Sequence, residues 1–344
     1  MTPGQSQRSI IVVHPDFDRT WPWAADHFRV LWKAQGQTEF IRLAPDNGRP
    51  VCEIVADPVG VTRVVALNVP VTVECAARML ALREAVFSPE PSIEVGDALA
   101  AAGVRTYVQP SEGFWGQSVA EFALALTLCG LRRIPQLHRA ILITSPQPWD
   151  YAPPSGVGRP GARGQQFGDD PNFANGTVEG KRIRVVGAGN VASRYASFVH
   201  KQGTDVAAWD PFASEPCFHR TGARRELRLD SLFHDADIFA PMVPLTDETR
   251  GLVKREHLLS LPRGCLVFLV TRAAVCDMPT LRERVLADEL ALAADVWDVE
   301  PPPLDDPLLG RHNVVHTPHN AGRTREANLA WAENLAAQFD PSGE

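Results

Sequence analysis

The stretch from Arg182 to Ala192, RIRVVGAGNVA, constrains the fold of this chain more than any other segment. An apolar run ends on Gly187, and Gly189 follows just before residues that favour a helix. The first glycine permits a tight turn and the second lets the backbone approach a pyrophosphate. The amides of Asn190 and Val191 would then face the phosphates from the positive end of the helix. The pattern predicts a parallel α/β domain that binds a dinucleotide.

Asp210 adds to this prediction because it ends the next apolar run after the glycine turn. A carboxylate at that place accepts hydrogen bonds from the adenosine ribose hydroxyls and repels a 2′-phosphate. We therefore expect NAD as the cofactor, with NADP less favoured. The alternative is that the glycines only form a turn and Asp210 caps the segment after it. A nearby group of basic residues could also screen the repulsion; its members are His219, Arg220, Arg224, Arg225 and Arg228.

Short apolar runs alternate with helix-like segments in both halves of the chain, and this rhythm favours parallel α/β layers. In the first half, strands are expected at 9–13, 38–43, 63–67 and 103–108, with a helix-like stretch at 76–87. In the second half, strands are expected at 182–187, 205–210, 237–243, 265–270, 290–296 and 313–317. These runs are unbroken by polar residues, as is typical of strands that helices cover on both faces.

Three further segments organise the chain. The stretch 117–137 is strongly apolar and predicts a buried helix, and 325–339 predicts a helix that returns to the first domain. Residues 145–177 are rich in proline and glycine and predict a long loop or arm. We expect a substrate domain made of 1–112 and 320–344, and a cofactor domain at 113–319.

Composition narrows the class of protein. The 344 residues carry a net charge of −7, which argues against nucleic acid or an anionic membrane as a partner. The six cysteines show no disulfide or metal-binding spacing, and no histidine pair has the spacing of metal ligands, so no metal is implied. The scattered cysteines favour reduced, mostly buried thiols, so we expect a cytoplasmic protein, and no signal peptide or membrane-spanning run is visible.

Several motifs in the second half resemble those of the D-isomer-specific 2-hydroxyacid dehydrogenase family and its phosphoglycerate dehydrogenase-like members. In chain order they are SVAEFALAL, GKRIRVVGAGNVA, DPF, DIFAPMVPLTDETRGLV, VTRAAVCD, ADVWDVEP and NVVHTPHNAG. They run across about 117–325, whereas the first hundred residues match only in their strand and helix rhythm. The resemblance implies two doubly wound parallel-sheet domains, Rossmann-like and flavodoxin-like, with a cleft between them.

The resemblance also implies a catalytic set, in which Arg272 binds the substrate carboxylate and carbonyl, His319 is the general acid and base, and Glu300 favours the charged imidazole and orients it. This set suits an NAD-dependent oxidoreductase that interconverts a small 2-oxo acid and its D-2-hydroxy acid. Substrate contacts are expected from Arg272, Ser88 and Asn68. Cofactor contacts are expected from Gly187, Gly189, Asn190, Val191, Asp210, Pro244, Thr249, Thr271, Arg272, Asp295 and His319.

The identity of the substrate does not follow from the resemblance. The family's glycine-rich loop should lie near 87–93, but this chain reads FSPEPSI, in which two prolines remove amide donors and Glu90 would repel an anion. Leu269 and Ala273 stand where the family usually has asparagine and glycine. A homodimer is expected. Two other functions stay open: an NAD(H)-responsive binding protein like the family's corepressor branch, and an oxidoreductase that uses formate or phosphite.

Overall fold

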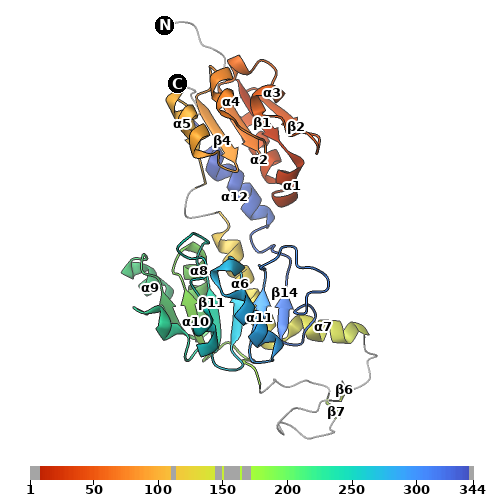
Figure 1. The fold of residues 1–344 in the computed structure, drawn as a ribbon, viewed down its shortest axis with the longest axis vertical. Helices are drawn as coiled ribbons and strands as arrows, with labels where there is room; N and C mark the ends of the chain where they lie inside the picture. Colours follow the sequence, from red (N-terminus) through yellow and green to blue (C-terminus); the bar gives the residue numbers. More distant parts are fainter. Residues whose placement is uncertain (1–7, 110–113, 144–148, 151–162, 165–171, 341–344) are drawn as a thin grey trace. The chain divides into compact units, whose positions relative to one another are not determined.

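The structure is a computed structural model that describes residues 8–109, 114–143, 149–150, 163–164 and 172–340 (Figure 1). The chain forms two compact units. The first contains Met1–Phe114 and Arg323–Glu344, and the second contains Trp115–Gly322.

The first unit is built on a parallel sheet with the strand order β2-β1-β3-β4-β5. The strands are β1 (Ser9–Val13), β2 (Thr38–Arg42), β3 (Arg63–Leu67), β4 (Glu84–Ser88) and β5 (Arg105–Tyr107). Every residue of β1 and of β3 is buried, as expected for apolar strands that helices cover on both faces. The order is that of flavodoxin-like sheets, in which the chain reverses its direction of growth between β1 and β3.

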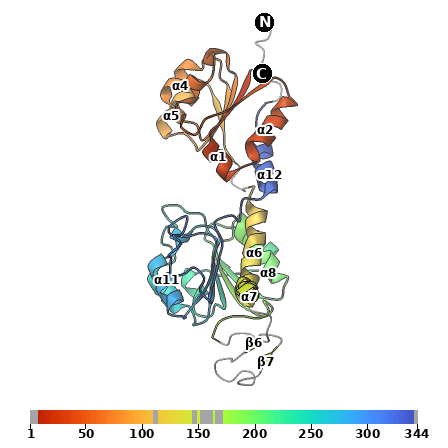
Figure 2. The ribbon, with the colours of Figure 1, turned by 90° about the vertical axis from the view of Figure 1, so that its right-hand side faces the viewer.

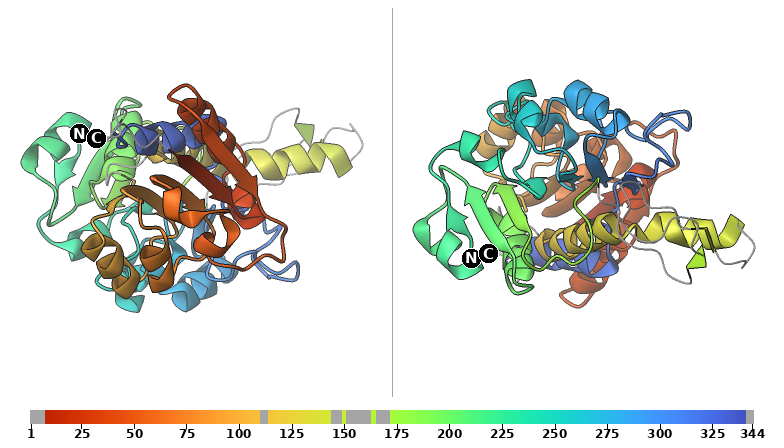
Figure 3. Two further views of the ribbon diagram at one scale, coloured as in Figure 1. Left: turned by 90° about the horizontal axis from the view of Figure 1, so that it is seen from above. Right: turned by 90° about the horizontal axis from the view of Figure 1, so that it is seen from below.

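Two helical layers cover this sheet, and Figure 2 shows them on opposite faces. One layer holds α2 (Ala24–Lys33) and α12 (Arg325–Ala336), which lie side by side in Figure 3. The other layer holds α3 (Val51–Ile54), α4 (Val73–Arg78) and α5 (Ile93–Ala101), while α1 (Pro15–Thr20) follows β1. Trp331 and Leu335 of α12 are buried against Phe28 of α2 in one hydrophobic cluster. The C-terminal helix therefore completes the core of the first unit.

The second unit contains a parallel sheet with the order β10-β9-β8-β11-β12-β13-β14. Its strands are β8 (Arg182–Val186), β9 (Asp205–Trp209), β10 (Arg224–Arg225), β11 (Ile238–Pro241), β12 (Leu266–Leu269), β13 (Ala291–Ala294) and β14 (Val314–His316). The first six of these follow the order of a Rossmann fold, and β14 extends the sheet at one edge.

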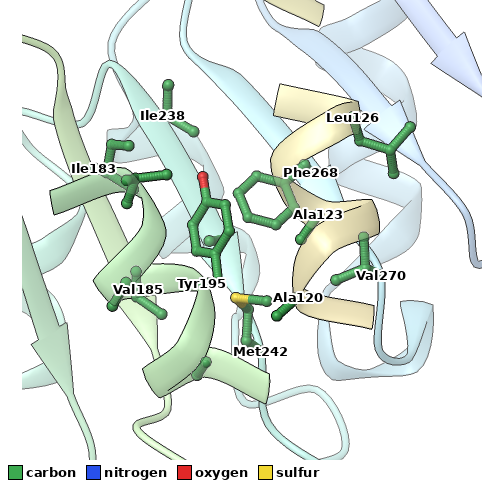
Figure 4. Packing of buried hydrophobic residues seen from close by; sticks show 14 of the residues in the cluster. Ala120, Ala123, Leu126, Ile183, Val185, Tyr195, Ile238, Met242, Phe268 and Val270 are labelled. Atoms are coloured by element: carbon green, nitrogen blue, oxygen red, sulfur yellow. The ribbon is translucent and has the colours of Figure 1, made fainter. Parts of the chain in front are cut away.

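Helices cover both faces of this second sheet as well (Figure 2). On one face lie α6 (Gly116–Arg132) and α8 (Asn190–His200), and on the other lie α10 (Arg255–Ser260) and α11 (Met278–Leu286); α9 (Glu215–Thr221) precedes β10. Tyr195 of α8 is fully buried, and its hydroxyl lies 2.9 Å from that of Thr127 in α6. Its ring packs against Phe268 of β12 with centroids 4.8 Å apart (Figure 4).

The fold class predicted from the sequence is confirmed, and two element predictions are corrected. The helix expected at 117–137 ends at Arg132, because Arg133 adopts a left-handed conformation (φ 52°), and α7 (Ile134–Ile143) begins after it. Proline at position 135 favours this break, since it lacks an amide donor and restricts the residue before it. The stretch 76–87 is not one helix, because α4 ends at Arg78 and β4 begins at Glu84.

Most of the predicted arm at 145–177 lies outside the described residues. Within it, β6 (Trp149–Asp150) pairs antiparallel with β7 (Arg163–Gly164). Over the part of the chain that the structure describes, no helix is long and apolar enough to cross a membrane. In the same residues, no three histidine, cysteine, aspartate or glutamate side chains are grouped to hold a metal ion.

Candidate active and cofactor site

The glycine turn joins β8 to α8, and glycine is needed at its two positions for different reasons. Gly187 has φ +107°, and a Cβ there would lie 2.9 Å from the carbonyl oxygen of Met242 in the neighbouring segment. Gly189 caps α8, has an ordinary φ of −71°, and would place a Cβ in open space. Gly187 is therefore required by the fold, whereas Gly189 keeps the space in front of the helix N-terminus clear. A pyrophosphate fits that space, since the first amides of α8 and the helix dipole favour an anion there.

Asp210 lies just beyond β9 and ties the glycine turn to the end of that strand. Its Oδ2 accepts a hydrogen bond from the amide of Ala188 at 2.8 Å. Its Oδ1 accepts from the amides of Phe212 and Ala213 at 2.9 and 3.1 Å. Asp210 thus does cap the segment after it, which was the alternative reading of the sequence. Because each carboxylate oxygen has two lone pairs, the same side chain can also accept from a ribose.

Three of the basic residues beyond Asp210 are paired with carboxylates. Arg225 contacts Glu215 at 2.9 Å and Arg228 contacts Asp230 at 3.5 Å, while Arg224 forms an ion pair with Glu226. The charge of each of these guanidinium groups is therefore neutralised by a neighbouring carboxylate.

The segments after β11 and β12 carry three further predicted cofactor residues. The Thr249 hydroxyl donates to the carbonyl oxygen of Pro244 at 2.6 Å and accepts from the amide of Thr246 at 2.7 Å, which closes a compact turn. The Thr271 hydroxyl donates to the carbonyl of Pro241 at 3.3 Å and so links the ends of the two strands. All of these residues lie at the carboxyl edge of the sheet, where ligands bind in open α/β folds.

His319 and Glu300 form a direct pair in the second unit. Nδ1 of His319 lies 2.6 Å from Oε2 of Glu300, and the side chains are 33% and 36% exposed. His319 has φ +53°, a left-handed conformation that is uncommon outside glycine and costs free energy that the surrounding structure must offset. Nε2 of His319 has no hydrogen-bond partner among the described residues. The imidazole can therefore exchange a proton at Nε2 while Glu300 holds the other nitrogen.

Asp295 and Trp297 hold this pair in place, and the sequence reasoning had given neither of them that role. Asp295 is fully buried, and its carboxylate accepts from the Thr317 hydroxyl at 2.7 Å. It also accepts from the amides of the two residues after His319, Asn320 at 3.0 Å and Ala321 at 2.9 Å.

Trp297 holds the two segments in place through hydrogen bonds from both its backbone and its side chain. Its amide donates to Oε1 of Glu300 at 2.9 Å, and its indole donates to the carbonyl of Thr317 at 3.1 Å. The sequence contains two signals for this role. An acid directly follows an apolar strand, and a tryptophan lies two residues later. Together the two residues fix the turn that places the imidazole.

Arg272 follows β12, Asp295 follows β13, and the His319 turn follows β14. These three strands are neighbours and parallel, so the residues emerge at one edge of the sheet. Nη1 of Arg272 donates to the carbonyl of Thr271 at 2.7 Å, and the guanidinium forms no ion pair with any residue that the structure describes. It is thus an exposed cation at the edge that also carries the imidazole.

The two predicted substrate residues of the first unit lie at the carboxyl ends of β3 and β4. Asn68 has φ +53°, and its amide donates to the carbonyl of Ser88 at 2.5 Å. Asn68 lines a pocket of about 480 Å³, whereas Ser88 does not. The loop after Ser88 contributes Pro89 to Ser92. The segments after β1 and β2 add three polar lining residues that were not predicted from the sequence: His14, Asp16 in α1, and Asn47.

Comparison with known proteins identifies the second unit. Residues 159–321 match the model of the D-isomer specific 2-hydroxyacid dehydrogenase, NAD binding domain. D-3-phosphoglycerate dehydrogenase of Archaeoglobus fulgidus is 32% identical over 213 residues, which are 62% of this chain and 36% of that protein. Glyoxylate reductase of Korarchaeum cryptofilum is 27% identical over 232 residues, which are 67% of this chain and 64% of that protein. The match therefore spans little more than a third of the phosphoglycerate dehydrogenase.

Solved structures with the same fold cover nearly the whole chain. D-lactate dehydrogenase of Escherichia coli superposes with a TM-score of 0.66 at 18% identity, covering 95% of this chain and 94% of that one. The NAD⁺-bound 3-phosphoglycerate dehydrogenase of Entamoeba histolytica superposes with a TM-score of 0.62 at 16% identity, covering 96% and 94%. At these identities the likeness concerns the fold alone.

Proposed function

Because residues 159–321 match the D-isomer specific 2-hydroxyacid dehydrogenase, NAD binding domain, we propose that the chain belongs to this family and is an NAD-dependent oxidoreductase that interconverts a small 2-oxo acid and its D-2-hydroxy acid. The observation that carries this proposal is the pair formed by His319 and Glu300, with Nε2 of the imidazole left open.

The pair fits the chemistry of carbonyl reduction. NADH, when bound, supplies the hydride, and negative charge then develops on the carbonyl oxygen of the substrate. His319 donates a proton from Nε2 to that oxygen, and in the reverse direction it accepts the proton from the hydroxyl. Glu300 stabilises the charged imidazole and fixes its orientation through Nδ1. Asp295 and Trp297 preserve this geometry by holding the two segments that carry the pair.

Arg272 has the properties needed to bind the acid group of the substrate. Its guanidinium offers a planar set of donors that can engage a carboxylate and a carbonyl oxygen together, and no described acid competes for it. Asn68 and Ser88 are the proposed contacts from the first unit. This division makes residues 1–112 with 320–344 the substrate domain and residues 113–319 the NAD-binding domain.

We propose NAD rather than NADP as the cofactor. Asp210 would repel a 2′-phosphate, and three arginines beyond it, Arg224, Arg225 and Arg228, are already paired with Glu226, Glu215 and Asp230. The other proposed cofactor contacts are the glycine turn with Asn190 and Val191, the segments carrying Pro244, Thr249 and Thr271, and Asp295 as the acceptor of the nicotinamide amide. Fluorescence titration should give tighter binding of NADH than of NADPH, and the reverse order would refute the cofactor assignment.

The relatives act on different acids by their printed names, so the substrate must be found by experiment. The pocket of about 480 Å³ that Asn68 lines is large enough for a small 2-oxo acid, whereas Asp16 and Glu90 on its wall would repel the carboxylate of such an acid. We further propose that the protein works as a cytoplasmic homodimer. The described cysteines are free thiols, which fits a reducing compartment.

A panel of substrates tests the proposal. Glyoxylate, hydroxypyruvate, pyruvate and phosphonylated 2-oxo acids are each mixed with NADH and the protein, and loss of NADH absorbance is followed. We expect turnover of at least one of these acids, with the D-2-hydroxy acid as product. Formate and phosphite, each with NAD⁺, form a second arm. Tight NADH binding with no turnover in either arm would contradict the proposal and favour a dinucleotide-responsive binding protein.

A further inference from the structure

Two of the six cysteines meet inside the first unit, which does not contain the residues proposed for hydride transfer. Cys52 lies on α3 and Cys75 on α4, and their Sγ atoms are 2.7 Å apart. Both residues are 1% exposed. Sequence spacing does not predict this pair, since 22 residues separate the two cysteines and no short cysteine motif is present. The fold brings them together because α3 and α4 cover the same face of the sheet.

The pair is connected to the pocket of the first unit. The amide of Val51, the first residue of α3, donates to the carbonyl of Pro70 at 3.0 Å, and Pro70 lines the pocket. The hydroxyl of Thr72, which precedes α4, lies 3.5 Å from the sulfur of Cys75. The segment between the two cysteines contains β3 and the pocket wall at 68–71. A covalent bond between the two sulfurs would therefore close a loop around that wall.

We propose that Cys52 and Cys75 are an oxidisable dithiol, converted to a disulfide by a low-molecular-weight disulfide such as oxidised glutathione. In the first step one protein thiolate attacks the small disulfide, which forms a mixed disulfide and releases one small thiol. In the second step the other protein thiol displaces the second small thiol. The protein loses two protons and two electrons and gains one S–S bond, while the small disulfide is reduced to two thiols. Disulfides of this kind in reducing compartments are typically transient and regulatory.

Burial makes this oxidation slow but selective. Desolvation, together with the contact to Cys75, raises the pKa of Cys52 to about 12, so little thiolate exists near neutral pH. Attack must also follow local opening, because both sulfurs are enclosed. The helix α3 has only four residues, so this opening breaks few helical hydrogen bonds. The rate of oxidation should therefore rise as the pH increases from about 7 to about 9.

The chain offers matched controls in Cys265 and Cys276. Both are buried, and burial raises the pKa of each thiol, in the case of Cys276 to about 12. Neither has a second cysteine sulfur within hydrogen-bonding distance among the described residues. They resemble Cys52 in burial and acidity but lack its partner.

The test is differential alkylation of the wild-type protein. It is incubated with oxidised glutathione, quenched, unfolded in guanidinium chloride with iodoacetamide, digested, and analysed by mass spectrometry. We expect the peptides carrying Cys52 and Cys75 to be joined and two mass units lighter than the sum of the reduced pair, while Cys265 and Cys276 are alkylated. Alkylation of Cys52 and Cys75 to the same extent as Cys265 and Cys276 would overturn the proposal.

The melting temperature distinguishes a disulfide between Cys52 and Cys75 from a non-covalent contact of the two thiols. Closing a loop of about 20 residues restricts the unfolded chain, so the oxidised protein should melt about 5 °C higher than the reduced protein. The gain should disappear on reduction and be absent in Cys52→Ser and Cys75→Ser. Cys265→Ser serves as the control variant and should keep the gain. Equal melting of oxidised wild type and oxidised Cys75→Ser would contradict a Cys52–Cys75 bond.

Discussion

At the scale of single residues, the site depends on side chains that hold others in place. His319 adopts a left-handed backbone conformation on the turn that follows β14, and such a conformation persists only where neighbours enforce it. Asp295 holds the backbone in this conformation by accepting three hydrogen bonds, two of them from the amides of the residues that follow His319. The resemblance to known dehydrogenases had suggested Asp295 as a nicotinamide contact. The structure adds a positioning role that no sequence motif expresses.

The Asp295→Asn variant tests this positioning role. An amide NH₂ in place of one carboxylate oxygen would face a backbone amide or the Thr317 hydroxyl, leaving buried donors unsatisfied at a cost of about 1–3 kcal/mol. We expect lower turnover with folding preserved, as measured by steady-state kinetics and chemical denaturation. Asp298→Asn is a matched control, because Asp298 is a nearby carboxylate that pairs with Arg282 outside this turn. Wild-type turnover in Asp295→Asn would remove Asp295 from the positioning of His319.

At the level of secondary-structure elements, the turn between β8 and α8 contains one glycine that folding requires, Gly187, and one that cofactor binding requires, Gly189. Gly187→Ala would place a methyl group 2.9 Å from a carbonyl oxygen at a positive φ, so it should lower stability by about 1–3 kcal/mol. Gly189→Ala meets no protein atom, so its stability should stay close to wild type. Its methyl group would nevertheless fill the approach of the pyrophosphate, and NADH affinity should fall.

Calorimetry and NADH titration on both glycine variants distinguish these roles. The expected pattern is a destabilised Gly187→Ala and a stable Gly189→Ala that binds NADH weakly. If Gly189→Ala binds NADH as wild type does, the proposed place of the pyrophosphate is wrong.

Arg184, at the middle of β8, forms ion pairs with two carboxylates that should make stability depend on pH. Arg184 is 2% exposed and contacts Asp235 at 2.6 Å and Asp205 at 2.9 Å. Its hydrogen bond to Asp235 lowers the pKa of that carboxyl below 3.8. A depressed acid pKa stabilises the folded state above the pKa of the unfolded state, and this contribution is lost as pH falls through the folded value. Asp235 is itself partly exposed, so solvent reduces the effect to about 1 kcal/mol.

Asp235→Asn should therefore lower the free energy of unfolding at pH 7, with a smaller deficit near pH 2, because the wild-type carboxyl takes up its proton as the pH falls. Urea denaturation at both pH values measures this difference. Asp247→Asn provides the control, since Asp247 is exposed and forms no ion pair with the described residues. A deficit that is equal at both pH values would show that the Arg184 pair is not its source.

Most elements could be predicted from the sequence because their hydrophobic patterns are strong. The run RVVAL and the run LVFL became β3 and β12, and GAGNVA became the turn and the start of α8. The break at Arg133 was missed because the apolar pattern continues through it, and only the left-handed residue before Ile134 and Pro135 interrupts the helix. The strand β4 was missed because Ala, Leu, Arg and Glu before it favour a helix, and its pairing with β3 and β5 decides the outcome.

The candidate site was predictable only in part, for a related reason. His319 and Glu300 stand out because prolines flank them, and the predicted pair proves to be in direct contact. The roles of Trp297 and of the Cys52–Cys75 pair depend on contacts between segments far apart in sequence. Spacing along the chain does not encode such contacts, since the paths of the intervening strands and helices determine them.

At the scale of the whole molecule, the chain leaves the first unit after Phe114, forms the second, and returns at Arg323. The returning helix α12 supplies Trp331 and Leu335 to the core around Phe28, and Phe339 beyond it packs against Trp32 with ring centroids 4.9 Å apart. Burying three such side chains contributes about 5 kcal/mol or more, which is comparable to the net stability of a small domain. The first unit therefore requires both ends of the chain.

Deleting residues 323–344 should unfold the first unit and leave the second intact, because the two units have separate cores. Hydrogen exchange should show lost protection in β1, β3 and β4, with protection retained in β8, β11 and β12. NADH affinity should stay within a few fold of the full-length value. Native-like protection of β1 and β3 in the truncated protein would contradict the structural role of α12.

The most direct test of the account is a single-turnover comparison of wild type, His319→Ala and His312→Ala, each with bound NADH and the best 2-oxo acid from the panel. His312 is an exposed histidine that pairs with Asp288 and serves as the matched control. If His319 is the proton donor, His319→Ala should oxidise NADH 10²- to 10⁴-fold more slowly, with NADH affinity unchanged, while His312→Ala should react as wild type does. Equal rates of NADH oxidation in His319→Ala and wild type would contradict the assignment of the proton donor.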